Sequence, residues 1–425
     1  MVSYKVKIER EGLMVSVGTI AGENSQTARF CYDEEYIKSC KVPISLSLPL
    51  QSAPFSAVQT KNYFEGLLPE GFTRRSVAGY MHVDESDYLT ILHGLGRECL
   101  GAVSITEEAE ETEASYERIS EKQVKELAAE GVEKSSEFVI KAHLSLTGAS
   151  GKVGLYYDMP GNRWYLPRGT APSTHIVKQS HIRLGAIVTN EQLSMLTAAR
   201  CGISIPRSFI INTGEGNENE VLFATQRYDR VFSRRPDMIS GLPRPDRLHQ
   251  EDFAQAMGIP SAEKYENGQK GYMEMMFEIL RKHSADPIKD QLKLWDLIIF
   301  HYLIGNTDAH IKNFSILHDS NLRTMRLAPA YDIVSTVVYE QCTRDMAFSI
   351  GDAFSVDDIS EESFRVAARR VGIGEKIAMT HFEEMVRRFK EALLQSAYEL
   401  TVKGYTKAPE IEGRILQYGG IKKYL

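Results

Sequence analysis

Residues 304–316 read IGNTDAHIKNFSI, and they follow an apolar segment, LKLWDLIIFHYL, at residues 292–303. The apolar segment predicts a buried helix, so the polar stretch should be the loop in which that helix reaches the surface. Two carboxamides, a carboxylate, an imidazole and a lysine gather in this loop: Asn306, Asp308, His310, Lys312 and Asn313. This composition makes the loop the first candidate for a functional site.

The spacing within the loop fits the catalytic loop of a kinase, in which Asp, four further residues and then Asn follow one another. Here Asp308 is followed by AHIK and then by Asn313. The carboxylate can accept the proton of an attacking hydroxyl, and the carboxamide oxygen can hold Mg²⁺. Downstream, Asp332 in APAYDIVS would be a second magnesium ligand. Upstream, Lys178 ends the alternating run THIVK, where its ammonium could contact nucleotide phosphates.

Each of these residues also has a structural interpretation when it is taken alone. Asp308 favours the turn that ends a helix, Lys178 could be a solvated strand residue, and Asp332 could start a turn. Their order along the chain favours the catalytic interpretation. A zinc or iron site built from Asp308, His310 and Asp332 is a weaker alternative, because no second histidine stands at ligand spacing and Lys312 would lie beside the ion.

A glycine- and serine-rich turn at residues 145–152, SLTGASGK, is the candidate for covering the phosphates. Its backbone N–H groups could cradle phosphate oxygens. The residues concerned are Gly148, Ser150, Gly151 and Lys152. The stretch is neither a G-x-G-x-x-G nor a Walker A motif, so a plain hairpin turn is the first alternative.

Composition limits the class of protein. With 425 residues, 43% of them apolar, the chain can bury a large core and should form two or more lobes. Its five cysteines are odd in number and scattered without a C-x-x-C pair, which argues against disulfides and favours a reducing, cytoplasmic location. We expect neither a signal segment nor a membrane span. The net charge of -7 would repel DNA, so contact with DNA should be local or indirect.

The pattern predicts an α+β, two-lobed, protein-kinase-like fold: a β-rich N-terminal lobe with an extra strand-rich N-terminal module, and an all-α C-terminal lobe. The expected domains are the strand-rich module at 1–110, an acidic linker with a short helix at 111–137, a kinase N-lobe at 138–229 and a helical C-lobe at 230–425. Ser120 and Gln123 are spaced as the capping box of the linker helix. In the N-lobe, strands are expected within 137–146, 152–158, 174–180, 208–214 and 221–229, and Asn190 should cap a helix at 190–203.

Taken together, the motifs resemble the HipA-like serine/threonine kinases, the toxin halves of bacterial HipA–HipB toxin–antitoxin modules. The resemblance spans nearly the whole chain and rests on FEGLLPEG, GRECLGAV, SLTGASGK, PSTHIVK, NEQLSMLTAARCGI, QRYDR, HQEDFAQAMG, GNTDAHIKNFSI and LAPAYDIVS. It implies that Asp308 is the catalytic base, with His310 and Lys312 in the same loop, and that Asn313 and Asp332 bind Mg²⁺. It also implies that Lys178 contacts the phosphates of ATP.

Further roles follow from the same resemblance. The adenine should lie against the interlobe segment Gln226, Arg227, Tyr228 and Asp229. Ser145 matches the autophosphorylated serine of the family, with Thr147 and Ser150 as alternatives. The implied cofactors are ATP and Mg²⁺. The implied partners are a HipB-like DNA-binding antitoxin, which would provide only an indirect contact with DNA, and an aminoacyl-tRNA synthetase as protein substrate, with no membrane involved.

Two rival functions stay open. The pattern D-x-H-x-x-N also resembles the loop of phosphoinositide kinases, so a lipid or small-molecule kinase is one alternative, although no basic membrane face is apparent. A catalytically silent, antitoxin-binding regulatory subunit is the other, although the four catalytic candidates are intact.

One segment breaks the acidic trend of the chain. Residues 226–250 hold six arginines against three aspartates, with three prolines and a glycine, which predicts an irregular segment between the lobes. It is either a solvated loop or a docking site in which guanidinium groups meet an acidic or RNA-bound substrate. The docking interpretation involves Arg234, Arg235, Arg244 and Arg247.

Overall fold

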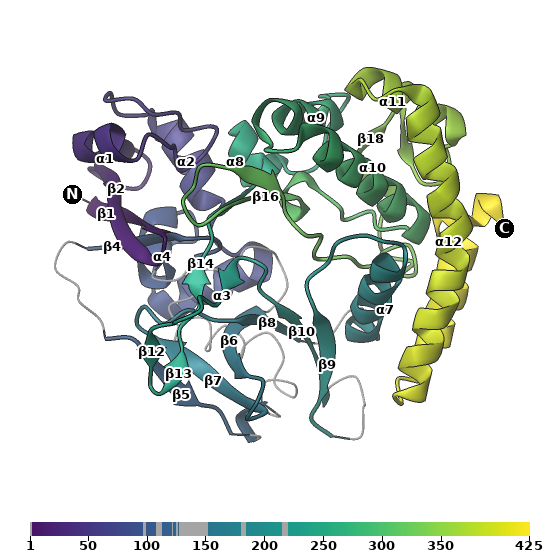
Figure 1. Ribbon diagram of the computed structural model, residues 1–425, viewed down its shortest axis with the longest axis horizontal. Coiled ribbons are helices and arrows are strands. Elements are labelled where there is room, and N and C mark those ends of the chain that lie inside the picture. Colours follow the sequence, from purple (N-terminus) through teal and green to yellow (C-terminus); the bar gives the residue numbers. More distant parts are fainter. Residues whose placement is uncertain are drawn as a thin grey trace. The chain divides into compact units, whose positions relative to one another are not determined.

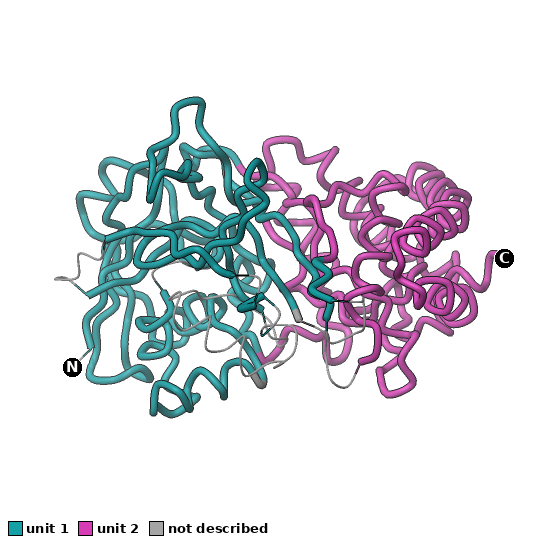
Figure 2. Tube along the Cα trace, turned by 90° about the horizontal axis from the view of Figure 1, so that it is seen from below, with its two compact units in different colours: residues 1–182, 211–261, 317–324 teal, residues 183–210, 262–316, 325–425 magenta. Residues whose placement is uncertain are grey.

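The protein is described by a computed structural model for residues 2–96, 99–107, 113–120, 122–124, 126, 152–179, 184–214 and 220–425. Helices and strands both occur, in line with the predicted α+β class (Figure 1). The chain divides into two compact units, which Figure 2 colours separately. Unit 1 comprises Met1–Ile182, Ile211–Ser261 and Leu317–Thr324, and unit 2 comprises Arg183–Ile210, Ala262–Ile316 and Met325–Leu425.

The N-terminal part of unit 1 is an antiparallel sheet with the strand order β3-β2-β1-β4. Its strands are β1 (Val2–Arg10), β2 (Leu13–Gly22), β3 (Arg29–Tyr32) and β4 (Val103–Thr106). Glu11 and Gly12 have φ values of +52° and +80°, which is the left-handed geometry that a two-residue turn between β1 and β2 requires. The strands expected here are confirmed.

Four helices in the same region were not expected. They are α1 (Glu34–Ser39), α2 (Ala57–Glu65), α3 (Gly71–Met81) and α4 (Tyr88–Leu95). They are short, so the hydrophobic period that identifies a helix repeats too few times to stand out. Their caps were the better signal: Ser56 and Gln59 form a capping box at α2, and Asp87 accepts a hydrogen bond from Thr90 N at α4.

A second sheet of unit 1 has the order β5-β7-β6-β8-β10-β9. Its strands are β5 (Ser115–Arg118), β6 (Lys152–Asp158), β7 (Arg163–Arg168), β8 (His175–Gln179), β9 (Ser208–Asn212) and β10 (Val221–Gln226); of β9, only Ile211 and Asn212 belong to unit 1. The strands predicted at 152–158, 174–180, 208–214 and 221–229 are confirmed, whereas 137–146 lies outside the described residues. Ser120 and Gln123 exchange the bonds of a capping box, as expected.

The arginine-rich segment is only partly irregular, because four strands of two residues each form within it. β11 (Arg230–Val231) pairs with β14 (Asp246–Arg247), and β12 (Met238–Ile239) pairs with β13 (Leu242–Pro243). Ile239 and Leu242 pack against a cluster of buried aromatic residues on the second sheet, Tyr116 and Tyr156. This apolar packing fixes the hairpin despite its prolines. β15 (Gln250–Asp252) and α8 (Phe253–Met257) follow.

Unit 2 is mainly helical. Its helices are α7 (Ile187–Arg200), α9 (Tyr272–His283), α10 (Pro287–Ile304), α11 (Glu361–Val371), α12 (Glu375–Val402) and α13 (Ala408–Tyr418). Trp295 of α10 is fully buried, and its ring meets Phe277 of α9 and Phe364 of α11 edge to face. The expectation of an all-α lobe needs a correction, because short strands also form: β17 (Met325–Leu327), β18 (Asp345–Ile350) and β19 (Ala353–Ser355).

Candidate active site

Helix α10 leads directly into the polar loop 304–316 of unit 2. Its start is fixed by Asp286, which accepts a hydrogen bond from Lys289 N, and by Pro287 in the first turn. It ends at Gly305, where φ is +71°. A Cβ at this position would lie 2.3 Å from Cγ2 of Val337, so only glycine allows the close approach of the two segments.

The side chain of Asp308 is exposed, and the residues that support it are buried. The side chain of Asn306 is buried: its Nδ2 lies 3.1 Å from Nδ1 of His301, and its Oδ1 accepts a hydrogen bond from Asp308 N at 3.2 Å. Burial lowers the pKa of His301 to about 3, so the ring is neutral at physiological pH. The Asp308 side chain is exposed, and its Oδ1 accepts a hydrogen bond from the hydroxyl of Tyr265.

Asn313 ends a single turn of 3-10 helix, Ile311–Asn313, that carries it back toward Asp308. Its Nδ2 donates to the main-chain oxygen of Asp308 at 2.9 Å. Because this bond uses the amide nitrogen, the carboxamide oxygen is the atom that a cation would meet. His310 and Lys312 are both buried, and the ring of His310 meets Tyr265 edge to face at 5.1 Å. These two residues therefore belong to the interior of the loop.

Asp332 follows β17 and is held close to the same loop. The hydroxyl of Tyr331 donates to Lys312 O at 2.9 Å, and Ser335 Oγ donates to Ile304 O at 2.6 Å. Asp332 lies between these two anchors with φ at +57°, a left-handed conformation that few side chains other than Asn and Asp adopt. Strained backbone of this kind is common at functional sites. Asp308, Asn313 and Asp332 thus all meet the end of α10.

Asn190 has a different place from the one predicted. Helix α7 begins at Ile187, so Asn190 lies inside the helix, and the prediction that it caps the helix is wrong. Its buried carboxamide donates to Ser335 O at 2.8 Å and accepts from Ser335 N at 3.1 Å. It therefore secures the segment that carries Asp332. Asn190 and Tyr265 are site residues that the sequence analysis missed.

The donors at the end of α10 suit magnesium. A carboxylate from Asp332 and a carboxamide oxygen from Asn313 are hard oxygen ligands, which Mg²⁺ prefers. Among the residues that the structure describes, no three His, Cys, Asp or Glu side chains gather as a metal-binding group. The alternative zinc or iron site of Asp308, His310 and Asp332 therefore finds no support there.

Two lysines lie opposite each other on neighbouring strands of unit 1. Lys178 of β8 pairs with Lys152 of β6 on one side and with Phe223 of β10 on the other. Both lysines are buried, and Nζ of Lys178 lies 5.6 Å from the centre of the Phe223 ring. Lys152 is thus a strand residue that shares the face of Lys178.

Two more residues share that face and were not singled out from the sequence. Ile176 precedes Lys178 by two positions, so strand alternation puts both side chains on one face, and the β8–β10 register pairs Ile176 with Thr225. Lys178 and Thr225 are buried, whereas Ile176 is only half-buried. Ile176 therefore offers apolar surface between the lysines and the segment that begins at Gln226.

The side chains of Arg227 and Asp229 are occupied within the fold, so a contact of these two residues with a cofactor would have to use their main-chain groups. Arg227 donates to Asp229 from Nε at 3.0 Å and from Nη2 at 2.7 Å, and it also reaches Cys99 O at 3.2 Å. Asp229 accepts from Gly101 N at 2.7 Å, and Arg230 donates to Gly101 O at 3.1 Å. This buried cluster ties residues 99–101 to the segment after β10. The hydroxyl of Tyr228 bonds to Gln250, so Gln226 and the main-chain groups of the segment are the parts that a nucleotide would meet.

Two of the four docking arginines are also occupied. Arg244 pairs with Glu9 and Asp246, and Arg247 is buried with a bond from Nη2 to Thr170 O. Arg234 and Arg235 are exposed. The candidate phosphate loop lies outside the described residues, including Ser145, Thr147, Gly148, Ser150 and Gly151.

Family models match most of the chain. The HipA N-terminal domain matches residues 14–106, and the HipA-like C-terminal domain matches residues 144–393. The second match alone covers more than half of the chain. It contains every catalytic and metal-binding candidate named above.

Individual relatives agree with the family models. The protein Y4mE of Sinorhizobium fredii, which carries a provisional name as a kinase, is 31% identical over 395 residues, covering 88% of this chain and 89% of that protein. The serine/threonine-protein kinase toxin HipA of Shewanella oneidensis is 24% identical over 372 residues, covering 83% of this chain and 80% of the toxin.

A solved structure shows the same fold. A chain from the complex of HipA, HipB and operator DNA of Shewanella oneidensis superposes with a TM-score of 0.76 at 21% identity, covering 97% of both chains. Among the helices of the described residues, none combines the length and the hydropathy needed to cross a bilayer. The family models and the relatives together lead to one conclusion: the chain belongs to the HipA family, and it has that family's kinase-like fold.

Proposed function

We propose that the protein is an ATP- and Mg²⁺-dependent serine/threonine protein kinase that acts as the toxin of a toxin–antitoxin module. The observation that carries the proposal is the arrangement at the end of α10, where Asp308 is exposed beside Asn313 and the clamped Asp332. A protein that only bound an antitoxin would have no need of an exposed carboxylate next to two oxygen ligands.

In the proposed reaction, Asp308 accepts the proton of a serine or threonine hydroxyl. Bound Mg²⁺-ATP supplies the phosphoryl group. The Asn313 oxygen and the Asp332 carboxylate would hold Mg²⁺, which would offset the negative charge of the phosphates, and Lys178 and Lys152 would contact the phosphates of ATP. Ile176 and the main chain from Gln226 to Tyr228 position the adenine.

Glu191 is a further candidate that the kinase template suggests. Kinases pair the phosphate-contacting lysine with a glutamate of the following helix. Glu191 lies in α7, the helix that follows β8, and it is buried. A buried carboxylate needs a cationic or hydrogen-bonding partner, so we include Glu191 among the residues to be tested by substitution.

Incubation with labelled ATP and Mg²⁺ tests the function, with the protein alone, with cell lysate and with lipid vesicles. Label on a serine or threonine of a lysate protein is the expected result, and Asp308→Asn should abolish it. Asp358→Asn is the matched control, because Asp358 is an exposed carboxylate of unit 2 outside the site. Label confined to lipid would favour the lipid-kinase alternative, and no label at all would favour the silent subunit.

The partners are proposed from the family. We assign a HipB-like antitoxin, because the structurally similar HipA chain was solved together with HipB and operator DNA. We assign an aminoacyl-tRNA synthetase as substrate, with Arg234 and Arg235 as the exposed arginines of the hairpin segment that could dock it. Alanine at both should lower labelling of the synthetase and leave ATP binding unchanged. If no synthetase is labelled in lysate, this substrate class is wrong.

Autophosphorylation at Ser145 would act as an off switch. A phosphate adds about two negative charges at neutral pH, and on the candidate phosphate loop it would compete with ATP. Mass spectrometry after incubation with ATP should find phosphate on Ser145, and the modified protein should no longer bind ATP. Full activity of the modified protein would contradict the switch.

A further inference from the structure

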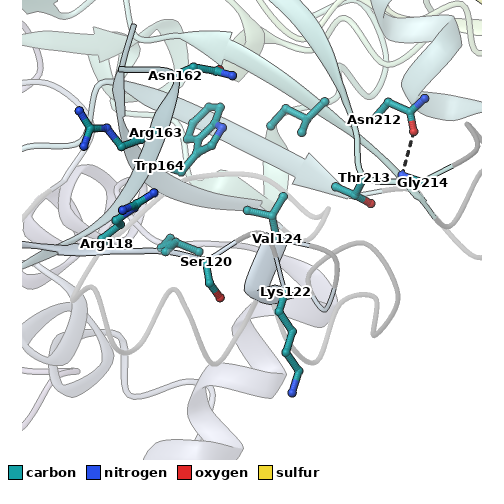
Figure 3. Close-up of a pocket in the computed structure, with 12 residues that line it drawn as sticks. Arg118, Ser120, Lys122, Val124, Asn162, Arg163, Trp164, Asn212, Thr213 and Gly214 are labelled. Carbon is teal, nitrogen blue, oxygen red and sulfur yellow. Dashed lines mark hydrogen bonds between the residues drawn. The ribbon is translucent and has the colours of Figure 1, made fainter. Parts of the chain in front are cut away.

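Unit 1 holds a polar pocket of about 1010 Å³, and none of its described lining residues was assigned to the ATP site proposed above (Figure 3). Its volume is at the upper end of the range for small-molecule sites, roughly 300–1,000 Å³. Its described lining contains three basic side chains and no carboxylate, although the chain as a whole has a net charge of -7. The lining residues used below are Arg118, Asn162, Arg163, Trp164, Asn212 and Val124.

An aromatic platform forms one wall of the pocket. Trp164 of β7 stacks on Tyr157 with 4.4 Å between ring centres, and it meets His175 edge to face at 5.6 Å. These contacts hold the indole in one orientation while it stays half-buried. Ile119 and Val124 are buried and add apolar surface. A rigid, partly open indole is suited to stacking on a flat aromatic ring of a ligand.

Cations lie next to this platform. Arg163 adjoins Trp164 in sequence, and the β5–β7 register places Arg118 opposite Tyr165, the other neighbour of Trp164. Arg163 is 3.5 Å from Asp158, and its own side chain is 47% exposed, so this ion pair is only partly shielded from solvent and leaves the guanidinium accessible to another anion. Figure 3 shows both arginines on one side of the Trp164 ring, whereas Lys122 extends away from it. Guanidinium groups at this position favour phosphate.

Carboxamides complete the wall. Asn162 Oδ1 accepts from the Tyr157 hydroxyl at 2.7 Å, and Asn212 Oδ1 accepts from Gly214 N at 3.0 Å. Both bonds use the carboxamide oxygen, so the amide NH₂ groups are the parts that can turn to a ligand. As donors, they suit phosphate oxygens or the carbonyl groups of a base.

We propose that this pocket binds a nucleotide, with its base on Trp164 and its phosphates on Arg118 and Arg163, at a site separate from that of the phosphoryl donor. The same chemistry is offered by a free nucleoside triphosphate and by a nucleotide of an RNA strand. The site does not depend on the kinase assignment, because none of the described residues that line it takes part in the proposed phosphoryl transfer.

Tryptophan fluorescence gives a direct readout, since the chain has only two tryptophans. In the variant Trp295→Phe, Trp164 is the single emitter, and Lys178→Ala in the same chain removes the proposed donor site. GTP should quench the emission saturably. Arg118→Ala with Arg163→Ala should weaken the binding by about tenfold or more, as loss of hydrogen bonds to a charged group does. Arg29→Ala with Arg323→Ala is the matched control, because both arginines are exposed in unit 1 outside the pocket, and it should change nothing.

Isothermal titration of GTP into the Lys178→Ala chain, with and without Trp164→Phe, repeats the test if replacement of the buried Trp295 prevents folding. No quenching and no heat up to about 1 mM GTP, a range that includes weak binding, would overturn the site. So would equal binding after loss of Arg118 and Arg163. If tripolyphosphate binds as tightly as GTP, the nucleobase does not contribute to binding. Tighter binding of a short RNA oligonucleotide than of GTP would assign the ligand to RNA, and the reverse would assign it to a free nucleotide.

Discussion

Replacement of Asp229 by alanine should open the buried cluster that joins residues 99–101 to the segment after β10. The carboxylate accepts from Arg227 at 3.0 and 2.7 Å and from Gly101 N at 2.7 Å, and it lies 2.9 Å from Arg230 Nη1. Its loss leaves two buried guanidinium groups without their counter-ion. Breaking a buried ion pair in this way costs about 3–5 kcal/mol.

The pH dependence of stability gives a second estimate of how much the ionised Asp229 carboxylate stabilises the fold. Burial acts to raise the pKa of Asp229, but Arg227 and Arg230 outweigh it and hold the pKa at about 2, below the ordinary 3.8. Because the folded pKa is lowered, the stabilisation is complete above pH 4 and is lost as the pH falls toward 2. It amounts to about 2 kcal/mol at neutral pH, at about 1.4 kcal/mol for each pKa unit. Protonation of Asp229 therefore costs less stability than the Asp229→Ala substitution, since the protonated side chain stays in place.

Hydrogen–deuterium exchange of peptides covering residues 99–107 and 225–231 measures the effect locally. A loss of 3–5 kcal/mol should speed exchange there by about 100-fold or more. Glu117→Ala is the control, because it removes an exposed partner of Arg168 and should cost about 1 kcal/mol or less. Exchange in Asp229→Ala within about threefold of the parent, less than 1 kcal/mol, would refute the claim that this carboxylate holds the two segments together.

Three further outcomes test the site. Asp308→Asn should lower phosphoryl transfer by about 10²–10⁴-fold with an unchanged melting temperature, because the side chain is exposed; a normal rate in the labelled-ATP assay would rule it out as the base. Asn313→Ala and Asp332→Ala should each reduce the rise in melting temperature caused by Mg²⁺-ATP, and an undiminished rise would show that they are not the ligands. Asn190→Leu should cost about 1–3 kcal/mol, since Ser335 would keep two unpaired backbone groups; chemical denaturation checks this, and a variant as stable as the parent would contradict it.

The sequence predicted those features of the structure that depend on residues close together along the chain. Alternation placed Lys178 on a strand, and β8 contains it. The spacing between Asp308 and Asn313 became a hydrogen bond across the loop. The turn between β1 and β2 is likewise formed by two adjacent residues, Glu11 and Gly12, both with positive φ values. In each case the residues that determine the geometry lie within a few positions of one another.

The missed features depend on distant partners. Asn190 resembles a helix cap in the sequence because Ser335, which satisfies its carboxamide, is 145 residues away. Arg244 resembles a docking residue because Glu9, which neutralises it, is 235 residues away. Tyr265 gives no pattern of its own, yet its hydroxyl meets Asp308. The composition of residues 226–250 gives the number of arginines but not which of them are already paired. The number of arginines available for docking was therefore overestimated.

The division into two units has a consequence for biosynthesis. The chain passes between the units at 182/183, 210/211, 261/262, 316/317 and 324/325, so neither unit is a continuous stretch of polypeptide. Unit 1 needs Leu317–Thr324 to be complete, and these residues leave the ribosome long after the first 182. At about 5–20 residues per second this delay is on the order of 10 s. During that interval the nascent N-terminal part exposes surface that its last segment will cover, which makes it a natural substrate for chaperones. A fragment cut at any single position before Thr324 would retain the same defect.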